Sequence, residues 1–147
     1  MKNWFKIDKE DLEKIKPFKW FNRRGYIMAH IYKNGKRTSL YMHRLIMNVP
    51  DGTEIDHIDG DGLDNRKKNL RFATRQQNAF NQPLNSFNTS GFKGVGWVKA
   101  RKRWRAILCL NGRDIYLGIF KDKFDAARAY NKGATQYFGE YARLNII

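Results

Sequence analysis

A short acidic segment inside an otherwise basic chain is the feature that most limits what this sequence can fold into. Residues 51–64, DGTEIDHIDGDGLD, contain no Lys or Arg and hold six carboxylates: Asp51, Glu54, Asp56, Asp59, Asp61 and Asp64. The 147-residue chain carries 29 Lys and Arg against 14 Asp and Glu, a formal charge of +15, which favours a polyanionic partner, nucleic acid before membrane. Carboxylates beside phosphate need a cation between them, so the segment predicts a divalent-metal site. The alternative is a solvated turn rich in Asp and Gly.

The residues around this segment predict a strand, a turn, a second strand and a helix. In chain order, we expect a strand over 53–58, a turn through Gly60 and Gly62, a strand over 69–73 and a helix over 74–81 with Thr74 as its N-cap. A strand, a hairpin return and a helix can bring the first strand and the helix to one site.

Three side chains of this predicted unit can share that site. Asp56 and Asn78 offer two oxygen ligands to a hard cation such as Mg²⁺, which keeps water molecules for the rest of its shell. His57 follows Asp56 and points to the opposite side of the strand, so it can face a water molecule without binding the metal. Because an unperturbed imidazole has a pKa of about 6.5, it can accept a proton at neutral pH.

The other segments before residue 90 carry weaker local signals. We expect a short helix over 9–15 capped by Asp8, a β-hairpin of 25–32 and 36–41 joined at Lys33-Asn34-Gly35, and a short helix over 42–48. Residues 82–90 are polar, contain a proline and lack periodicity, which is typical of a linker. The domain prediction is therefore a first domain over 1–82, a linker over 83–90 and a second domain over 91–147.

The second domain has a different pattern. Three strand candidates, GVGWVKA, RWRAILCLNG and RDIYLGIF, precede a helix candidate over 121–139, and Asn-Gly joins the last two strands in a hairpin. Asp122 can cap that helix, and one apolar face of the helix holds Ala127, Tyr130, Ala134 and Phe138. We predict three antiparallel strands packed on one helix. The fold class of the whole chain is then α+β.

The central strand of this sheet has two distinct faces. Trp104, Ala106, Leu108 and Leu110 alternate on the face suited to pack under the helix, and the other face holds Arg103, Arg105, Ile107 and Cys109. Lys99, Arg101, Arg113 and Tyr116 on the neighbouring strands could join this second face. A cationic, partly aromatic face suits a sheet that reads DNA. The alternative is an ordinary solvated face.

The string IDHIDGDGLDNRKKNLRFATRQQN (55–78) closely resembles the HNH family of ββα-metal nucleases, in its homing-type branch of phage or intron origin. The resemblance covers roughly residues 25–82. It implies that Asp56 and Asn78 bind one Mg²⁺ or Mn²⁺, that His57 is the general base, and that Asn69 braces the loop carrying the base. His43, in LYMHRLIM, becomes a candidate supporting or phosphate-contacting residue. Arg75 is a candidate phosphate contact, or else a solvated arginine.

Residues 91–145 resemble an APETALA2-type DNA-binding domain. The segments that carry the resemblance are KGV, RWRA, YLGIF, AARAYN and FGEYARLN. It implies a three-stranded sheet in the major groove, with Lys93, Arg103 and Tyr116 at DNA-contacting places. The chain departs from the family at base-contacting places, which hold Ile107, Cys109 and Asp114, so the family's target sequence does not transfer. Arg101, Arg105 and Arg113 are the replacements we consider.

Together these patterns predict a metal-dependent DNA endonuclease that binds double-stranded DNA as a monomer. No apolar run approaches the roughly 18 residues of a membrane span, and no signal peptide is evident, so we expect the cytoplasm of a bacterial or phage-infected cell. The single Cys109 excludes internal disulfides and a cysteine-rich zinc site. Two alternatives stay open: a DNA-binding regulator with an inactive nuclease relic, and a basic RNA-binding or structural protein.

Overall fold

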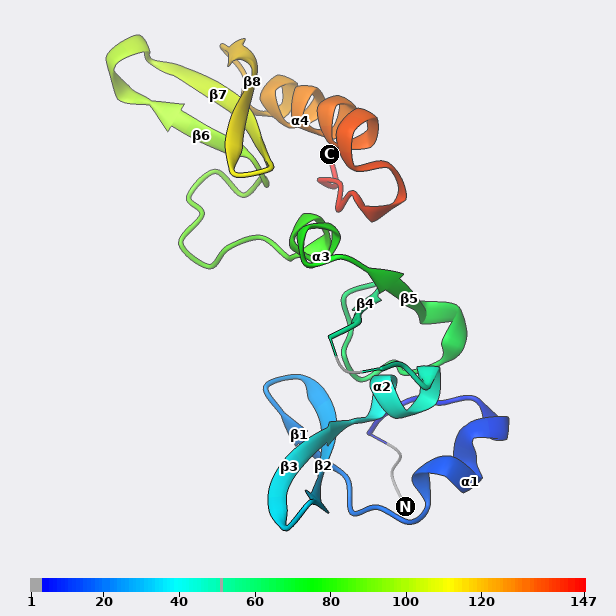
Figure 1. Cartoon of the computed structure of the whole chain (residues 1–147). Coiled ribbons are helices and arrows are strands. Elements are labelled where there is room, and N and C mark those ends of the chain that lie inside the picture. The colour runs from blue at the N-terminus through cyan, green and yellow to red at the C-terminus, as the bar shows by residue number, and fades with distance from the viewer. Residues whose placement is uncertain (1–3, 51) are drawn as a thin grey trace. The chain divides into compact units, whose positions relative to one another are not determined.

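The computed structural model describes residues 4–50 and 52–147, which form two compact units, Met1–Asn78 and Ala79–Ile147. Figure 1 shows short helices and small sheets in the first unit, and one sheet with one longer helix in the second. All named strands pair antiparallel, so the α+β class expected from the sequence is confirmed. Among the described residues, no helix is both long enough and apolar enough to span a bilayer.

A three-stranded sheet begins the first unit. Its strands, in spatial order, are β1 (Phe21–Arg23), β2 (Tyr26–Lys33) and β3 (Lys36–Tyr41). The predicted hairpin of β2 and β3 is confirmed, and Asn34 and Gly35 adopt the positive φ angles of 52° and 72° that a two-residue turn requires. The sequence did not predict β1, because three residues are too few to show an alternating pattern.

Short helices pack around this sheet. The 3₁₀ turn η1 (Lys9–Asp11) and α1 (Leu12–Ile15) form the predicted helix near the N-terminus, and α2 (Met42–Met47) is the helix expected after the hairpin. The predicted Asp8 cap is wrong: the Asp8 side chain makes no cap bond and instead accepts from the Lys67 N–H at 2.8 Å, because Lys67 lies beside it in the fold. The buried core of the unit consists of Ile15, Ile27, Met42, Ile46, Ile55 and Leu70. This core joins the sheet and helices to the acidic segment that follows.

The strand–turn–strand–helix unit predicted around the acidic segment is present. Its elements are β4 (Glu54–His57), η2 (Lys67–Asn69), β5 (Leu70–Ala73) and α3 (Arg75–Asn81). Thr74 caps α3 as expected: its Oγ1 accepts from the Gln77 N–H at 3.2 Å, while Gln77 Oε1 accepts from the Thr74 N–H at 2.7 Å. This reciprocal pair fixes the start of α3 directly after β5.

The second unit is a three-stranded sheet covered on one face by a helix (Figure 1). The elements are β6 (Val95–Val98), η3 (Lys99–Arg101), β7 (Arg103–Leu110), β8 (Arg113–Phe120), α4 (Lys123–Phe138) and η4 (Gly139–Tyr141). Asp122 caps α4 by accepting from the Phe124 N–H at 2.6 Å, which confirms the predicted cap. The predicted inner face of α4, Ala127, Tyr130, Ala134 and Phe138, is buried.

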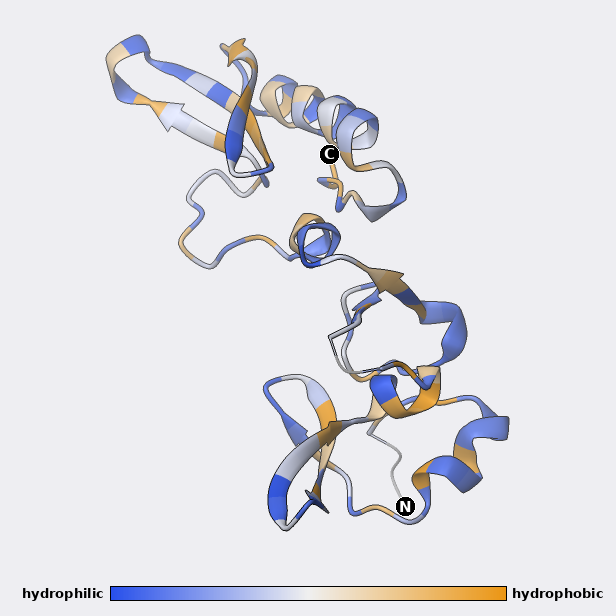
Figure 2. Cartoon of the chain, in the orientation of Figure 1, coloured by the Kyte–Doolittle hydropathy of each residue, from blue (hydrophilic) through white to orange (hydrophobic). Residues whose placement is uncertain are grey.

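Small residues let α4 lie close to the sheet. A Cβ added at Gly133 would come within 2.8 Å of the Leu117 side chain, so only glycine fits there without a shift. Figure 2 shows both hydrophilic and hydrophobic residues on β7 and β8, with the second half of β7 apolar throughout. Phe80 of α3 stacks on Phe138 with ring centroids 3.7 Å apart and extends this core.

The strand register corrects one expectation about the outer face of this sheet. Tyr116 pairs with Ile107 and so lies on the outer face, as predicted. Arg113 pairs with Leu110 and therefore lies on the side of the sheet that faces α4, not on the cationic face where we expected it. The reason is the two-residue Asn111-Gly112 turn, which places the residues before and after it opposite each other.

Candidate active site

The β4–β5 pair places Asp56 and His57 on opposite sides of one strand, as the alternation predicted. Asp56 lies opposite Arg71 in the register, and His57 lies opposite Leu70. Arg71 donates from Nε to Asp56 Oδ2 at 2.9 Å and from a terminal nitrogen to the same oxygen at 2.6 Å. The Asp56 side chain is only 9% exposed, so this pairing compensates a nearly buried carboxylate.

His57 is buried among aromatic rings on the other side of β4. Its ring centroid lies 5.0 Å from that of His43, in an edge-to-face arrangement, and 5.9 Å from that of Tyr26. Its Nε2 lies 3.4 Å from the Asn65 Oδ1. Burial lowers the pKa of His57 below its ordinary 6.5, against the opposing effects of Asn65 and of the nearby acids, chiefly Asp59. The imidazole is therefore neutral at pH 7.

His43, at the start of α2, is the second buried imidazole of the site. Burial, the neighbouring His57 and Arg44 together lower the pKa of His43 to about 3. Its Nδ1 is buried and has no hydrogen-bond partner among the described residues. His43 is thus a neutral ring that packs directly against the candidate base.

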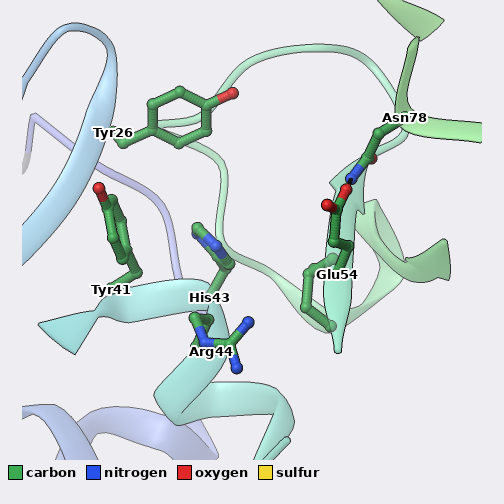
Figure 3. A pocket seen from close by; sticks show the side chains of 7 residues that line it. Tyr26, Tyr41, His43, Arg44, Glu54 and Asn78 are labelled. Atoms are coloured by element: carbon green, nitrogen blue, oxygen red, sulfur yellow. Dashed lines mark hydrogen bonds between the residues drawn. The ribbon is translucent and has the colours of Figure 1, made fainter. Parts of the chain in front are cut away.

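A pocket of about 310 Å³ opens beside His43 (Figure 3). Residues from β2, β3, α2, β4 and α3 line it: Tyr26, Tyr41, His43, Arg44, Glu54, Ile55 and Asn78. Asn78 Nδ2 donates to Glu54 Oε2 at 2.6 Å, and Figure 3 shows the two side chains reaching toward each other. This hydrogen bond places Asn78 of α3 next to β4, the strand that carries Asp56.

The loop after β4 is closed by Asn69. Asn69 Oδ1 accepts from the Asp59 N–H at 3.1 Å, and Asn69 Nδ2 donates to Asp59 Oδ1 at 2.8 Å and to the Asp64 carbonyl at 2.9 Å. These bonds join both ends of the loop. They match the brace expected of this residue, whose part in catalysis stays a prediction.

Three of the six carboxylates of the acidic segment serve this loop. Asp59 accepts from the Asp61 N–H and Asp61 from the Leu63 N–H, which are local turn bonds. Asp64 binds the Arg66 guanidinium, which lowers the pKa of Asp64 to about 2. Asp51 lies outside the described residues. Of the remaining acids, Glu54 lines the pocket, whereas Asp56 is not part of its lining and binds Arg71.

The donor atoms present fit a hard cation. No group of three or more His, Cys, Asp and Glu side chains lies close enough to hold a metal within residues 4–50 and 52–147. The predicted pair, the Asp56 carboxylate and the Asn78 amide, would supply two oxygen ligands and leave the other positions to water and phosphate, as Mg²⁺ and Mn²⁺ accept. The Arg71 guanidinium already binds Asp56, so a cation there would have to share this carboxylate with Arg71.

Comparison with known proteins decides the family. A family described as HNH endonuclease matches residues 41–80. An uncharacterized HNH endonuclease of Acanthamoeba polyphaga mimivirus is 31% identical over 140 residues, which cover 90% of this chain and 70% of that protein. The chain belongs to the HNH endonuclease family.

Other relatives of this HNH endonuclease come from phages. Protein 3.8 of Escherichia phage T7 is 42% identical over 96 residues, which cover 65% of this chain and 78% of that protein. The DNA endonuclease I-HmuI of Bacillus phage SP01 is 30% identical over 84 residues, covering 53% of this chain and 48% of that protein. In the solved I-HmuI structure the match covers 44% of this chain and 41% of that chain, with a TM-score of 0.38.

The second unit of this HNH endonuclease has a partial match of another kind. An AP2-like ethylene-responsive transcription factor of Arabidopsis thaliana is 32% identical over 59 residues, which cover 40% of this chain and 12% of that protein. The match is too partial to transfer a DNA-binding role, so the APETALA2-like domain stays a proposal.

The predicted DNA-contacting residues of this HNH endonuclease differ in their exposure and in their hydrogen bonds. Most are exposed: Arg75 at the start of α3, Lys99 and Arg101 in η3, Arg105 on β7, and Arg113 and Tyr116 on β8. Arg103 is half-buried, and its NH1 donates to the Lys102 carbonyl at 2.9 Å. Lys93 instead donates to the Phe80 carbonyl at 2.5 Å and the Gln82 carbonyl at 2.8 Å, and burial beside Arg143 lowers the pKa of Lys93 to about 8. Its DNA contact stays a prediction.

Sequence reasoning about this HNH endonuclease missed three residues of the site. Glu54 contacts Asn78, Arg71 contacts Asp56, and Asn65 lies against His57. Glu54 could have been found, because it lies two residues before Asp56 and therefore on the same side of β4. Nothing in the local sequence signalled the other two contacts.

Proposed function

We propose that this protein is a homing-type DNA endonuclease that hydrolyses a phosphodiester bond of double-stranded DNA with one divalent metal and a histidine general base. The observation that carries the proposal is the joining of three features in one unit: Asp56 and His57 on opposite sides of β4, and Asn78 beside that strand. Family membership, the name of the DNA endonuclease I-HmuI and the charge of +15 support it.

Asp56 and Asn78 would hold a Mg²⁺ or Mn²⁺ ion, which would supply charge neutralisation at the scissile phosphate. His57 takes the proton of the attacking water. Asn65 Nδ2 donates to the Gly62 carbonyl, so Asn65 Oδ1, an acceptor, faces His57 Nε2. This arrangement favours the tautomer with hydrogen on Nε2, which makes Nδ1 the nitrogen that receives the proton. Burial keeps the ring neutral and ready to accept it.

The second unit would position the enzyme on its target. We propose that a domain over 91–147, joined through residues 83–90 to a nuclease domain over 1–82, binds DNA with the outer face of its sheet. Arg105 and Tyr116 are exposed on that face, and Lys99 and Arg101 lie at its edge. Contacts of Lys and Arg to phosphate position a protein, and contacts to base edges give specificity. We propose that the enzyme acts as a monomer in the cytoplasm of a bacterial or phage-infected cell.

A supercoiled-plasmid assay tests the proposal. Wild-type protein should nick or linearise the plasmid with Mg²⁺ or Mn²⁺ and leave it intact with EDTA, and His57→Ala should lose this activity. His30→Ala is the matched control, because His30 is an exposed histidine on β2 whose ring lies against Phe21 and does not line the pocket. A shift of the plasmid without strand scission in metal would overturn the nuclease account in favour of a DNA-binding regulator.

A further inference from the structure

Glu54 is an acidic side chain in the candidate site with no part in the mechanism above. It lies on the same side of β4 as Asp56, lines the pocket, and is half-buried. A carboxylate near the place where phosphate must bind repels the substrate. Its presence there therefore calls for a compensating role in the site. Its carboxylate is hydrogen-bonded to Asn78, at 2.6 Å between Glu54 Oε2 and Asn78 Nδ2 (Figure 3).

The chemistry of the two groups gives this bond a direction. An ionised carboxylate only accepts hydrogen bonds, whereas an amide has a donating NH₂ end and an accepting oxygen end. The Glu54 carboxylate therefore binds the NH₂ end of the Asn78 amide, so the Asn78 Oδ1 points away from Glu54. Hard cations bind the oxygen of an amide and not its nitrogen. The orientation of the amide thus decides whether Asn78 can act as a ligand.

We propose that Glu54 is a positioning residue that holds the Asn78 amide with its oxygen available to the cation. The inference rests on the proposed function, in which Asn78 is a metal ligand, and deepens it by naming the residue that orients that ligand. Partners that orient metal ligands in this way typically contribute 10–100-fold to metal affinity. Glu54 acts through its acceptor atoms, and this separates it from a residue that attracts the cation by charge alone.

Two substitutions separate these roles. Glu54→Met removes both the acceptor and the charge while keeping a similar length, and Glu54→Gln removes the charge but retains an acceptor oxygen. If orientation is the role, Glu54→Met should weaken the binding of Mn²⁺ roughly 10–100-fold, and Glu54→Gln should stay close to wild type. Equal losses in the two variants would overturn the orientation account in favour of simple charge attraction.

A second test uses a variant of residue 78 whose side chain does not need to be oriented. In Asn78→Asp, residue 78 presents an oxygen in either rotation, so adding Glu54→Met should no longer weaken Mn²⁺ binding. If the second substitution costs as much in this background as in the wild type, Glu54 does not act through the amide, and the inference is wrong.

The measurement is the affinity of the full-length protein for Mn²⁺ alone, from the electron paramagnetic resonance signal of the free ion, with thermal unfolding without metal as the check on folding. Asp56→Ala tests the underlying site. If wild type binds no Mn²⁺, or Asp56→Ala binds as wild type does, the proposed function fails and the inference fails with it. If Asp56→Ala loses binding while Glu54→Met binds as wild type does, the inference alone fails.

Discussion

Arg71 lies directly opposite Asp56 across the β4–β5 pair and binds one of its carboxylate oxygens through two nitrogens, at 2.9 Å and 2.6 Å. The two side chains are 12% and 9% exposed. The guanidinium therefore compensates the charge of the candidate metal ligand inside the protein. A cation that binds Asp56 must share the carboxylate with Arg71 or displace it.

Removal of Arg71 should take a cationic partner away from the nearly buried Asp56 carboxylate. We expect Arg71→Met to lower the free energy of unfolding by roughly 3–5 kcal/mol, the usual cost of removing one partner of a buried pair. Added Mn²⁺ should restore more stability to this variant than to the wild type, because the ion replaces the missing positive charge. Urea unfolding with and without Mn²⁺ measures both effects. Arg75→Met, at the exposed start of α3, is the charge-matched control, and equal behaviour of the two variants would contradict the prediction.

Buried His43 should make stability depend on pH. Its pKa is about 3 in the folded protein, below the ordinary 6.5, so the unfolded chain binds the proton more readily. The free energy of unfolding should therefore fall as pH falls from 6.5 toward 3, by up to about 1.4 kcal/mol per pH unit from this group. His43→Phe keeps an aromatic ring and should reduce that slope, whereas His30→Phe, at an exposed position, should not. Urea unfolding at neutral and mildly acidic pH gives the slopes.

The bonds of Asn69 should hold the loop after β4 closed. Asn69→Ala removes a buried amide that bonds to Asp59 and to the Asp64 carbonyl, and we expect a loss of about 1–3 kcal/mol in stability. Amide hydrogen exchange should accelerate in residues 59–64, while α4 in the other unit keeps its protection. Unchanged exchange in the loop would show that Asn69 is not its brace.

The outer face of the second unit should bind DNA phosphates. Arg105→Gln should weaken binding to a DNA duplex and reduce the slope of log K against log salt by about 0.9 for each phosphate that the variant no longer neutralises. Tyr116→Ala should weaken binding without changing that slope, because it removes no charge. Arg128→Gln is the control, since Arg128 is exposed on α4 and paired with Asp125. Fluorescence anisotropy over a range of salt concentrations checks these effects, and equal weakening by the Arg105 and Arg128 substitutions would contradict the assignment.

Local signals in the sequence predicted most of the fold. The Asn34-Gly35 turn, the Thr74 cap and the Asp122 cap each act within four residues, and the structure confirms all three. The face of Arg113 could also have been predicted, because a two-residue turn pairs it with Leu110. The error came from assigning Arg113 to a face by its charge instead of by the register.

Contacts between residues far apart in the chain could not be predicted from the sequence. Glu54 and Asn78 are 24 residues apart, and Asp56 and Arg71 are 15 apart. The first contact depends on how α3 packs against β4, and the second on the exact register of β4 and β5. No alternation or spacing within a single element determines either of these. The motif thus identifies the candidate ligands and base, and the tertiary structure identifies the residues that hold them in place.

The most direct test of the central claim is the single-turnover rate of DNA cleavage by His57→Ala in saturating Mg²⁺, measured together with its affinity for Mn²⁺. A general base contributes about 10²–10⁴-fold to the rate, so cleavage should slow by about that factor. Mn²⁺ affinity should not change, because His57 lies on the side of β4 opposite Asp56. A variant that cleaves at the wild-type rate, or that loses Mn²⁺ together with cleavage, would contradict the assignment of His57 as the base.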